Sequence, residues 1–290
     1  PQKRKRHLNK ESKFIRFKYE DRICYGFIKD EEVLDLSAYY RSAEDLLSAW
    51  HRGTIDLGEN PSIPAAQLEK ISFLPPTASG RNFCVGRNYM SHRQELDSNE
   101  FADANVSGNP SIFMRNKESL VGHKCELFKS PATDCFDFEG ELAAVIGVEG
   151  KATSENQAFD LIAGYTCFMD GSARDFQVDS VGAGKNFDRS GSIGPWIVST
   201  REIGDPQALK IETRLNGKIM QQASTAEMIF SVADIVIYLS KFTTLKPGDV
   251  IATGTPSGVG MSRNPQIWLA PTDTIEICIS SIGCLANLVV

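Results

Sequence analysis

The chain has 290 residues, of which 41% are hydrophobic and 23% are charged, and its formal net charge is −6. These proportions lie near the average for globular proteins, which excludes fibrous and wholly disordered classes. The acidic excess disfavours nucleic acid as a partner, because most of the surface would repel a phosphate backbone. A membrane partner is not expected either, since the longest apolar run, residues 142–148, is too short to cross a bilayer.

The first ten residues, PQKRKRHLNK, form a basic tail without the apolar stretch that a secretory signal requires. We therefore expect a cytoplasmic protein. The run of basic residues 3–6 can mark a nuclear address or a nucleic-acid contact, but a solvated tail is the simpler interpretation.

Cysteine and histidine usage argues against a disulfide framework and a zinc site. The seven cysteines are dispersed and contain no CxxC pair, so we expect buried thiols in a reducing compartment. The four histidines stand at positions 7, 51, 92 and 123, too far apart for a zinc-binding motif.

The N-terminal part of the chain predicts a small α/β domain. Residues 13–36 largely alternate between apolar and polar side chains, which is typical of short antiparallel strands, and a helix is expected over residues 42–51. Polar and proline-bearing sequence follows, up to Pro75-Pro76. We place a boundary there, which divides the chain into a small N-terminal domain, residues 1–75, and a larger domain, residues 76–290.

The larger domain is predicted to be mainly β with some α-helix. Candidate strands are residues 83–85, 141–146, 193–198, 211–215, 250–253 and 275–279. The clearest helix begins at Ser224, where Ser224 and Glu227 form a capping box and an apolar stripe continues to Leu239. We expect this stripe to pack in the core.

Two glutamates come directly before the apolar run of residues 142–148. If this segment is a strand, Glu139 and Glu141 project from the same face, and Gly140 leaves space between them. Carboxylates held side by side are costly unless a proton or a cation compensates them, and a hard divalent cation is the usual solution. Taken alone, however, the pattern is also typical of an exposed edge strand.

A second group of polar residues follows an apolar strand that ends at Asp170. A helix starting about two residues later would place Arg174 and Gln177 on one face, within reach of the same ligand as Asp170. Further along, the glycines of residues 182–184 would let the backbone approach a ligand, to which Lys185 supplies a point charge. The alternatives are a surface ion pair and an ordinary glycine-rich turn.

Two further segments carry candidate groups. His92 and Glu95 lie three residues apart, on one face of a helix, as a general base or a water-activating pair requires, although such a pair is a weak signal by itself. Residues 253–260, TGTPSGVG, form a compact turn whose backbone and hydroxyl groups could bind a carboxylate. The sequence contains no GxSxG motif, so a serine nucleophile is not expected.

Over residues 80–290 the chain resembles the fumarylacetoacetate hydrolase family, in particular its acylpyruvate and fumarylpyruvate hydrolase members. The matching segments occur in the family's order: GRNYMSHRQEL, IFMRNKESLVGH, DFEGELAAVIG, GYTCFMDGSARDFQ, GKNFDRSGSIGPW and LKPGDVIATGTPSGVG. The resemblance implies a mixed β-sandwich roll with a small, variable N-terminal domain, and a homodimer. Two stretches depart from the common pattern: Arg115-Asn116-Lys117, where many relatives have two prolines after the basic residue, and Pro271-Thr272-Asp273.

The resemblance also implies three groups of site residues. The ligands of Mg²⁺, or of Mn²⁺ or Ca²⁺, would be Glu139, Glu141 and Asp170. The groups that hold the carboxylate and the oxygens of a small 2-oxo acid would be Arg174, Gln177, Lys185 and Thr255. The catalytic residues would be His92, Glu95 and Lys185, of which His92 and Glu95 resemble a dyad that activates water.

The activity implied by the resemblance is metal-dependent hydrolysis of a carbon-carbon bond in an acylpyruvate-type 1,3-diketo acid similar to fumarylpyruvate, with release of pyruvate, as in aromatic catabolism. The same metal-stabilised enolate would serve an oxaloacetate decarboxylase, or an isomerase or dehydratase acting on a 2-oxo acid. The motifs do not separate these reactions. A silent protein that binds 2-oxo acids is the non-enzyme alternative, although such a protein has no chemical reason to keep both the ligands and the dyad.

Overall fold

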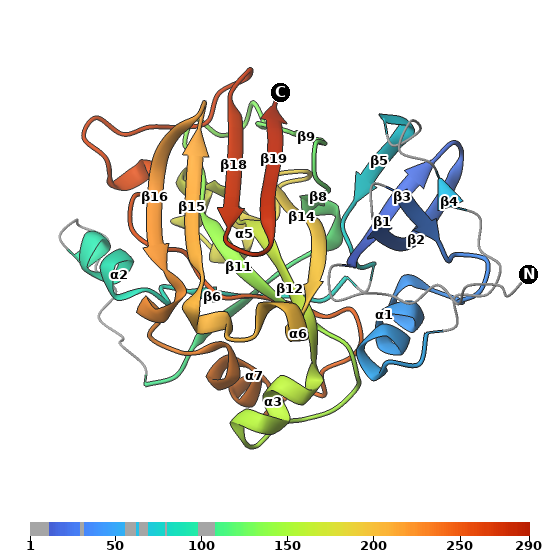
Figure 1. The fold of residues 1–290 in the computed structure, drawn as a ribbon. Coiled ribbons are helices and arrows are strands. Elements are labelled where there is room, and N and C mark those ends of the chain that lie inside the picture. Colours follow the sequence, from blue (N-terminus) through green and yellow to red (C-terminus); the bar gives the residue numbers. More distant parts are fainter. Residues whose placement is uncertain (1–11, 30–31, 56–61, 64–68, 79, 98–107) are drawn as a thin grey trace, which may run out of the picture.

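The computed structural model describes residues 12–29, 32–55, 62–63, 69–78, 80–97 and 108–290 (Figure 1). The basic tail lies outside the described residues, so its predicted role as a solvated tail stays a prediction. Within the described residues, β-strands in three sheets predominate over short helices. This confirms the mainly β class.

In the part of the chain that the structure describes, the largest sheet has 12 strands and begins with the N-terminal strands. Its main path is β4-β3-β2-β1-β14-β12-β11-β17-β6-β7, with β5 paired to β1 and β8 to β14. The strands are β1 (Lys13–Tyr19), β2 (Arg22–Lys29), β3 (Glu32–Asp35), β4 (Ser62–Ile63), β5 (Ile71–Leu74), β6 (Asn82–Gly86), β7 (Ser111–Arg115), β8 (Leu120–Val121), β11 (Gly140–Ile146), β12 (Ile162–Met169), β14 (Gly191–Ser199) and β17 (Val250–Ala252). Because β1 pairs with β14, one sheet continues across the predicted boundary near residue 75, and the boundary itself stays a prediction.

A second sheet of five strands has the order β16-β15-β18-β19-β9. Its strands are β9 (Glu126–Leu127), β15 (Lys210–Leu215), β16 (Lys218–Ser224), β18 (Thr274–Ile279) and β19 (Gly283–Val289). It packs face to face against β11, β12 and β14 (Figure 1). A two-stranded sheet joins β10 (Phe136–Asp137) to β13 (Ser172–Ala173).

Strand β11 shows how the core places the polar residues of this region. All seven of its residues are buried, and Leu142, Ala144 and Ile146 belong to the main hydrophobic cluster that lies between the two sheets. Ala143 belongs to a different cluster, with Phe168. Because successive side chains of a strand point to opposite faces, Glu141 shares the face of Ala143, away from the second sheet.

The described residues form seven α-helices, of which the longest has ten residues. They are α1 (Ala43–Arg52), α2 (Met90–Asp97), α3 (Glu155–Leu161), α4 (Arg174–Gln177), α5 (Val181–Lys185), α6 (Thr200–Ile203) and α7 (Val232–Ser240). Helix α1 confirms the expected helix over residues 42–51, and the Ser42 side chain caps it by accepting a hydrogen bond from the Asp45 N–H. In the described part of the chain, no helix has the length and apolarity needed to span a membrane.

The single helix expected from Ser224 onward is wrong. The capping box of Ser224 and Glu227 is present, but it closes a 3₁₀ turn, and α7 begins separately after its own cap, Ser231. Between them, the Ile229 N–H donates a 2.7 Å hydrogen bond to the carbonyl oxygen of Asn88. This bond to a distant segment replaces a helical one, so the helix is interrupted where the chain contacts the loop before α2.

The expectation that the cysteines are all buried thiols is also wrong. Cys278 and Cys284 face each other across the β18–β19 hairpin and form a disulfide. Of the remaining cysteines, Cys125 and Cys135 are only partly buried. The spacing of Cys278 and Cys284 does not indicate their disulfide, because whether two residues lie opposite each other across a hairpin depends on the register of its strands.

His123 stabilises the contact between β5 and β19 in its neutral form. Its Nδ1 accepts a hydrogen bond from the Ala286 N–H (3.0 Å), and its ring packs edge-on against Phe73, with the centroids 5.0 Å apart. Burial, followed by the charge of Lys124, lowers the pKa of His123 to about 4 from its ordinary 6.5.

We therefore expect the free energy of unfolding to fall as the pH drops from about 6.5 towards 4, because in this window the unfolded chain binds a proton that folded His123 does not. Urea unfolding at several pH values will measure this dependence. The variant His123→Gln should show a weaker dependence over the same range. An identical slope in both proteins would mean that other groups cause it.

Candidate metal centre and active site

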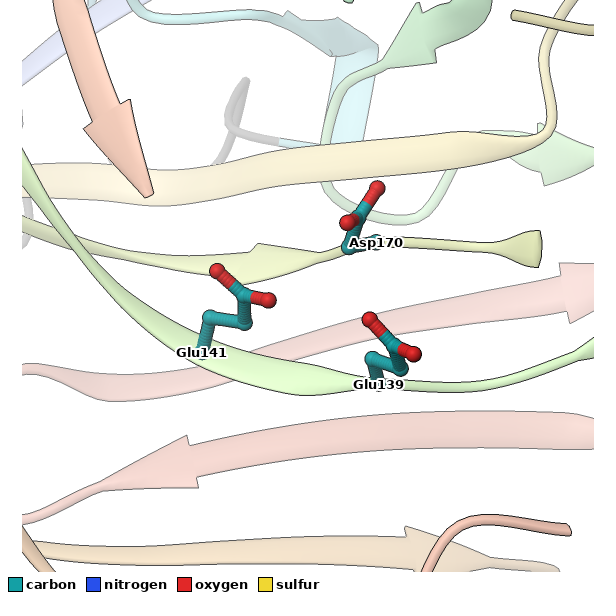
Figure 2. Close-up of side chains that lie close together, drawn as sticks. All are labelled: Glu139, Glu141 and Asp170. Carbon is teal, nitrogen blue, oxygen red and sulfur yellow. The ribbon is translucent and has the colours of Figure 1, made fainter. Parts of the chain in front are cut away.

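Three buried carboxylates meet where β11 begins and β12 ends. Glu139 directly precedes β11, Glu141 lies on it, and Asp170 directly follows the antiparallel neighbour β12. One carboxylate oxygen of each residue lies within 4.8 Å of the others. Figure 2 shows all three side chains on the same side of the two strands. Strand pairing therefore brings the acids of two separate motifs into one cluster.

Gly140 does not serve the purpose predicted from the sequence. A side chain at this position would point to the opposite face, where a Cβ would lie 2.0 Å from Thr213 Oγ1 and 3.0 Å from Ile277 Cδ1. The absence of a side chain thus lets the second sheet approach β11, and it does not open space between the glutamates. The reason is the alternation of side chains along a strand.

The side chains of Lys185 and Arg174 form ion pairs with the carboxylates. Lys185 Nζ lies 2.7 Å from Glu139 Oε2 and 2.6 Å from Asp170 Oδ2. Arg174 donates from Nη2 to Glu139 Oε1 (2.6 Å) and from Nη1 to Gln177 Oε1 (2.9 Å). The predicted carboxylate-binding groups Arg174, Gln177 and Lys185 are thus gathered beside the predicted metal ligands.

The three acids differ in how well their charges are compensated. Burial opposes ionisation of Glu139, but the nearby Lys185 and Arg174 charges outweigh it and lower the pKa of Glu139. Burial raises the pKa of Glu141 well above its ordinary value, and the charges of Asp170 and Glu139 raise it further. In the same way, burial opposes the charged form of Lys185, but Asp170 and Glu139 outweigh this and raise the pKa of Lys185. Glu141 is therefore the member of the cluster that most needs a proton or a further cation.

The site fits a divalent cation. Its donor atoms are carboxylate oxygens, the ligands that Mg²⁺ and Mn²⁺ prefer, and they converge from a rigid pair of strands. The ion-paired cluster has four carboxylates and three cations, namely Asp137, Glu139, Glu141, Asp170, Arg115, Arg174 and Lys185. With every group ionised it carries one net negative charge, which a divalent cation would reverse.

The predicted dyad is present on α2. His92 Nδ1 lies 3.2 Å from Glu95 Oε2, and the His92 side chain is buried. The other oxygen of Glu95 accepts a 2.9 Å hydrogen bond from the Gly258 N–H. In the same loop, the Gly254 N–H donates to Glu141 Oε2 (2.8 Å). Residues 253–260 thus bind carboxylates of the protein itself and connect the dyad to the acidic cluster, whereas their binding of a ligand carboxylate stays a prediction.

Thr255 lies beside the cluster, with its hydroxyl already engaged. It donates to the Gly140 carbonyl oxygen (2.9 Å) and accepts from Gln221 Nε2 (2.8 Å). The hydroxyl hydrogen is therefore used within the protein, and a contact of Thr255 with substrate oxygens, which stays a prediction, is better suited to its backbone N–H.

Residues 182–184 are helical, so the expected glycine-rich turn is absent there, and their approach to a ligand stays a prediction. They belong to α5, and a Cβ on Gly184 would lie 2.3 Å from Gln177 Cγ and 2.6 Å from the Ala173 carbonyl oxygen. Gly184 therefore lets α5 pack closely against α4. This contact brings Lys185 next to Arg174.

Sequence reasoning missed three residues that support the site. Asp137 is fully buried and accepts hydrogen bonds from Arg174 Nε (2.8 Å) and the Gly260 N–H (2.7 Å). Gln221 accepts from the Gly140 N–H (3.0 Å). Arg115 donates to Asp170 Oδ1 (2.6 Å). Asp137 and Arg115 lie within the quoted motifs, whereas no sequence signal indicates Gln221, which comes from β16.

Comparison with known proteins identifies the family. Residues 81–290 match the family model described as "Fumarylacetoacetate (FAA) hydrolase C-terminal". The chain belongs to the fumarylacetoacetate hydrolase family. It is an enzyme of this family, with a buried acidic triad whose carboxylates could hold a divalent metal.

Relatives within the family differ in their reactions. The chain is 40% identical to oxaloacetate tautomerase YisK of Bacillus subtilis, over 73% of this chain and 70% of that protein. It is 38% identical to the mitochondrial oxaloacetate tautomerase Fahd2a of Rattus norvegicus, over 79% of this chain and 72% of that protein. Among solved structures, the fumarylacetoacetate hydrolase of Exiguobacterium antarcticum superposes with a TM-score of 0.82 at 32% identity, covering 96% of this chain and 99% of that one.

Proposed function

We propose that this enzyme interconverts the keto and enol forms of oxaloacetate, or of a closely similar 2-oxo dicarboxylic acid. The observation that carries the proposal is the attachment of the His92–Glu95 dyad and the buried acidic cluster to one loop, through Gly258 and Gly254. The similarity to two oxaloacetate tautomerases favours this reaction over the acylpyruvate hydrolysis implied by the motifs. Both reactions pass through the enolate of a 2-oxo acid.

The charges of the site suit a dianionic substrate. A divalent cation held by Glu139, Glu141 and Asp170 would supply a Lewis acid that polarises the 2-keto oxygen. Arg174 and Lys185 both contact Glu139, so their charges lie at the edge of the same cluster and would attract a carboxylate. The substrate is thereby oriented with its 2-oxo acid end towards the cluster.

The dyad provides the proton transfer that tautomerisation requires. His92 would remove a proton from the carbon next to the keto group, and a proton would be returned at the oxygen to give the enol. Glu95 fixes the ring through Nδ1, so Nε2 is the atom left to act on the substrate. The Gly258 N–H holds Glu95 in place.

We expect enol–keto conversion to disappear in EDTA and to return with Mg²⁺ or Mn²⁺. The physical reason is that, without a divalent cation on the carboxylate cluster, the site lacks the Lewis acid that would polarise the keto oxygen. The conversion of freshly dissolved enol-oxaloacetate can be followed by ultraviolet absorbance, with the uncatalysed rate subtracted at each metal concentration. Undiminished conversion after exhaustive chelation would refute the metal role.

Hydrolysis of an acylpyruvate is the second candidate reaction. It is favoured by the same dyad, because a base paired with a carboxylate can activate water as well as move a substrate proton. Comparing kcat/KM for oxaloacetate tautomerisation, oxaloacetate decarboxylation and fumarylpyruvate hydrolysis in the wild-type protein will decide between them. A higher value for fumarylpyruvate would replace the proposed function with the hydrolase.

A further inference from the structure

Arg115, at the end of β7, is a fully buried arginine that no part of the proposed chemistry uses directly. Each of its five N–H groups has an acceptor. Nη1 donates to Asp170 Oδ1 (2.6 Å) and the Gly171 carbonyl (3.0 Å). Nη2 donates to Ser190 Oγ (2.6 Å) and the Ser119 carbonyl (3.4 Å), and Nε donates to Ser119 Oγ (3.1 Å). The guanidinium plane is therefore held from several directions.

The two oxygens of Asp170 consequently have different surroundings. Oδ1 is bound by Arg115, whereas Oδ2 lies 2.6 Å from Lys185 Nζ, which also contacts Glu139 Oε2 at 2.7 Å. A single ammonium group therefore touches Asp170 Oδ2 and the first glutamate of the triad. Oδ2 is therefore the oxygen of Asp170 that lies on the side of Lys185 and Glu139.

The residues around Arg115 leave room for its guanidinium group and position the groups that accept its hydrogen bonds. A Cβ on Gly191 would lie 2.8 Å from Arg115 Cζ and from both of its terminal nitrogens. Asn116 caps the following 3₁₀ turn, accepting from the Ser119 N–H (2.8 Å), and this turn brings Ser119 back to Arg115. The Asn116 N–H donates to Asn186 Oδ1 (2.7 Å), a bond that proline could not make. Asn116 thus has a structural role here that proline could not fill.

We propose that Arg115 is a positioning residue of the metal site. By occupying Asp170 Oδ1, it fixes the carboxylate rotamer so that Asp170 offers Oδ2 alone to a divalent cation. The proposal rests on the metal role given to Asp170 above, but not on which 2-oxo acid is the substrate. A purely structural arginine would stabilise the fold without affecting how tightly a metal binds.

Calorimetric titration of the full chain with Mn²⁺ alone tests the proposal. Groups that hydrogen-bond to metal ligands typically change affinity by about 10- to 100-fold. We expect Arg115→Met to weaken Mn²⁺ binding within this range. Arg115→Lys should weaken it less, because it keeps the charge but has three donors instead of five. Gly191→Ala, which displaces the guanidinium without removing it, should also weaken binding.

Two further variants separate the possible causes. Ser119→Ala removes a bond to Arg115 on the side away from Asp170, so it should lower the unfolding temperature while the Mn²⁺ affinity stays as in the wild type. Asp170→Asn should lose Mn²⁺ binding. Retained binding in Asp170→Asn would refute the metal role itself.

Unfolding temperatures will show which variants are folded, and only the Mn²⁺ affinities of the folded variants decide the question. Wild-type Mn²⁺ affinity in folded Arg115→Lys and Gly191→Ala, together with lost binding in Asp170→Asn, would overturn the positioning role and leave the metal site intact. If Arg115→Met does not fold, these two milder variants still decide the question.

Discussion

Glu141→Gln is expected to lower the affinity for Mg²⁺ or Mn²⁺ by more than about 100-fold, and the activity with it. This exceeds the usual effect of groups that only hydrogen-bond to ligands, because a ligand and its charge are both lost. The amide oxygen can still accept the Gly254 N–H, so the local backbone is preserved. Metal-dependent thermal stabilisation and calorimetry will measure the loss.

The same substitution should not destabilise the protein in EDTA. Burial and the charges of Asp170 and Glu139 raise the pKa of Glu141, so without metal this position favours a neutral side chain, which glutamine supplies. The expected result is an unfolding temperature in EDTA at least as high as that of the wild type, without the rise that metal causes in the wild type. The control is Glu118→Gln, an exposed glutamate that forms an ion pair with Lys117 at 3.8 Å, and it should behave as the wild type. Unchanged metal affinity in Glu141→Gln would exclude Glu141 as a ligand.

His92→Ala is expected to reduce tautomerisation, and any hydrolysis, by about 10²- to 10⁴-fold, the usual effect of losing a general base. Its hydrogen bond goes to Glu95, whereas Lys185 and Arg174 hold the acidic cluster independently of it. Binding of oxalate, a mimic of the pyruvate enolate, should therefore persist in the presence of metal. Stopped-flow absorbance and calorimetry will measure the two quantities separately.

Two comparisons refine this experiment. Gln94→Ala changes an exposed residue of the same helix and controls for disturbance of α2. Decarboxylation of oxaloacetate needs no base on the substrate carbon, so any such activity should survive in His92→Ala. Wild-type tautomerisation in His92→Ala would remove His92 from the mechanism. Loss of oxalate binding would show instead that His92 shapes the site.

The class of the fold and the candidate residues of the site could be predicted from the sequence alone. Alternating apolar residues predicted the strands around residues 13–36, because side chains of a strand alternate between two faces, whereas the continuous apolar run of residues 142–148 indicated the strand at 141–146. The same alternation indicated that Glu139 and Glu141 share a face. The motifs also contained Asp170, Lys185 and the pair His92 and Glu95. In the structure, Asp170 joins the acidic cluster and contacts Lys185, and Glu95, which pairs with His92, is bound by the loop of residues 253–260.

Which atoms meet in the site depends on the tertiary structure. Gly140 serves the packing of the second sheet, Cys278 pairs with Cys284, and Arg115 holds one oxygen of Asp170. In each case the contact joins separate strands or segments, so it depends on strand register and on how two sheets pack. A local pattern reports the period of one element and the residue types it carries. It does not indicate which residues of other elements will contact those residues, because these contacts depend on strand register and on the packing of the whole fold.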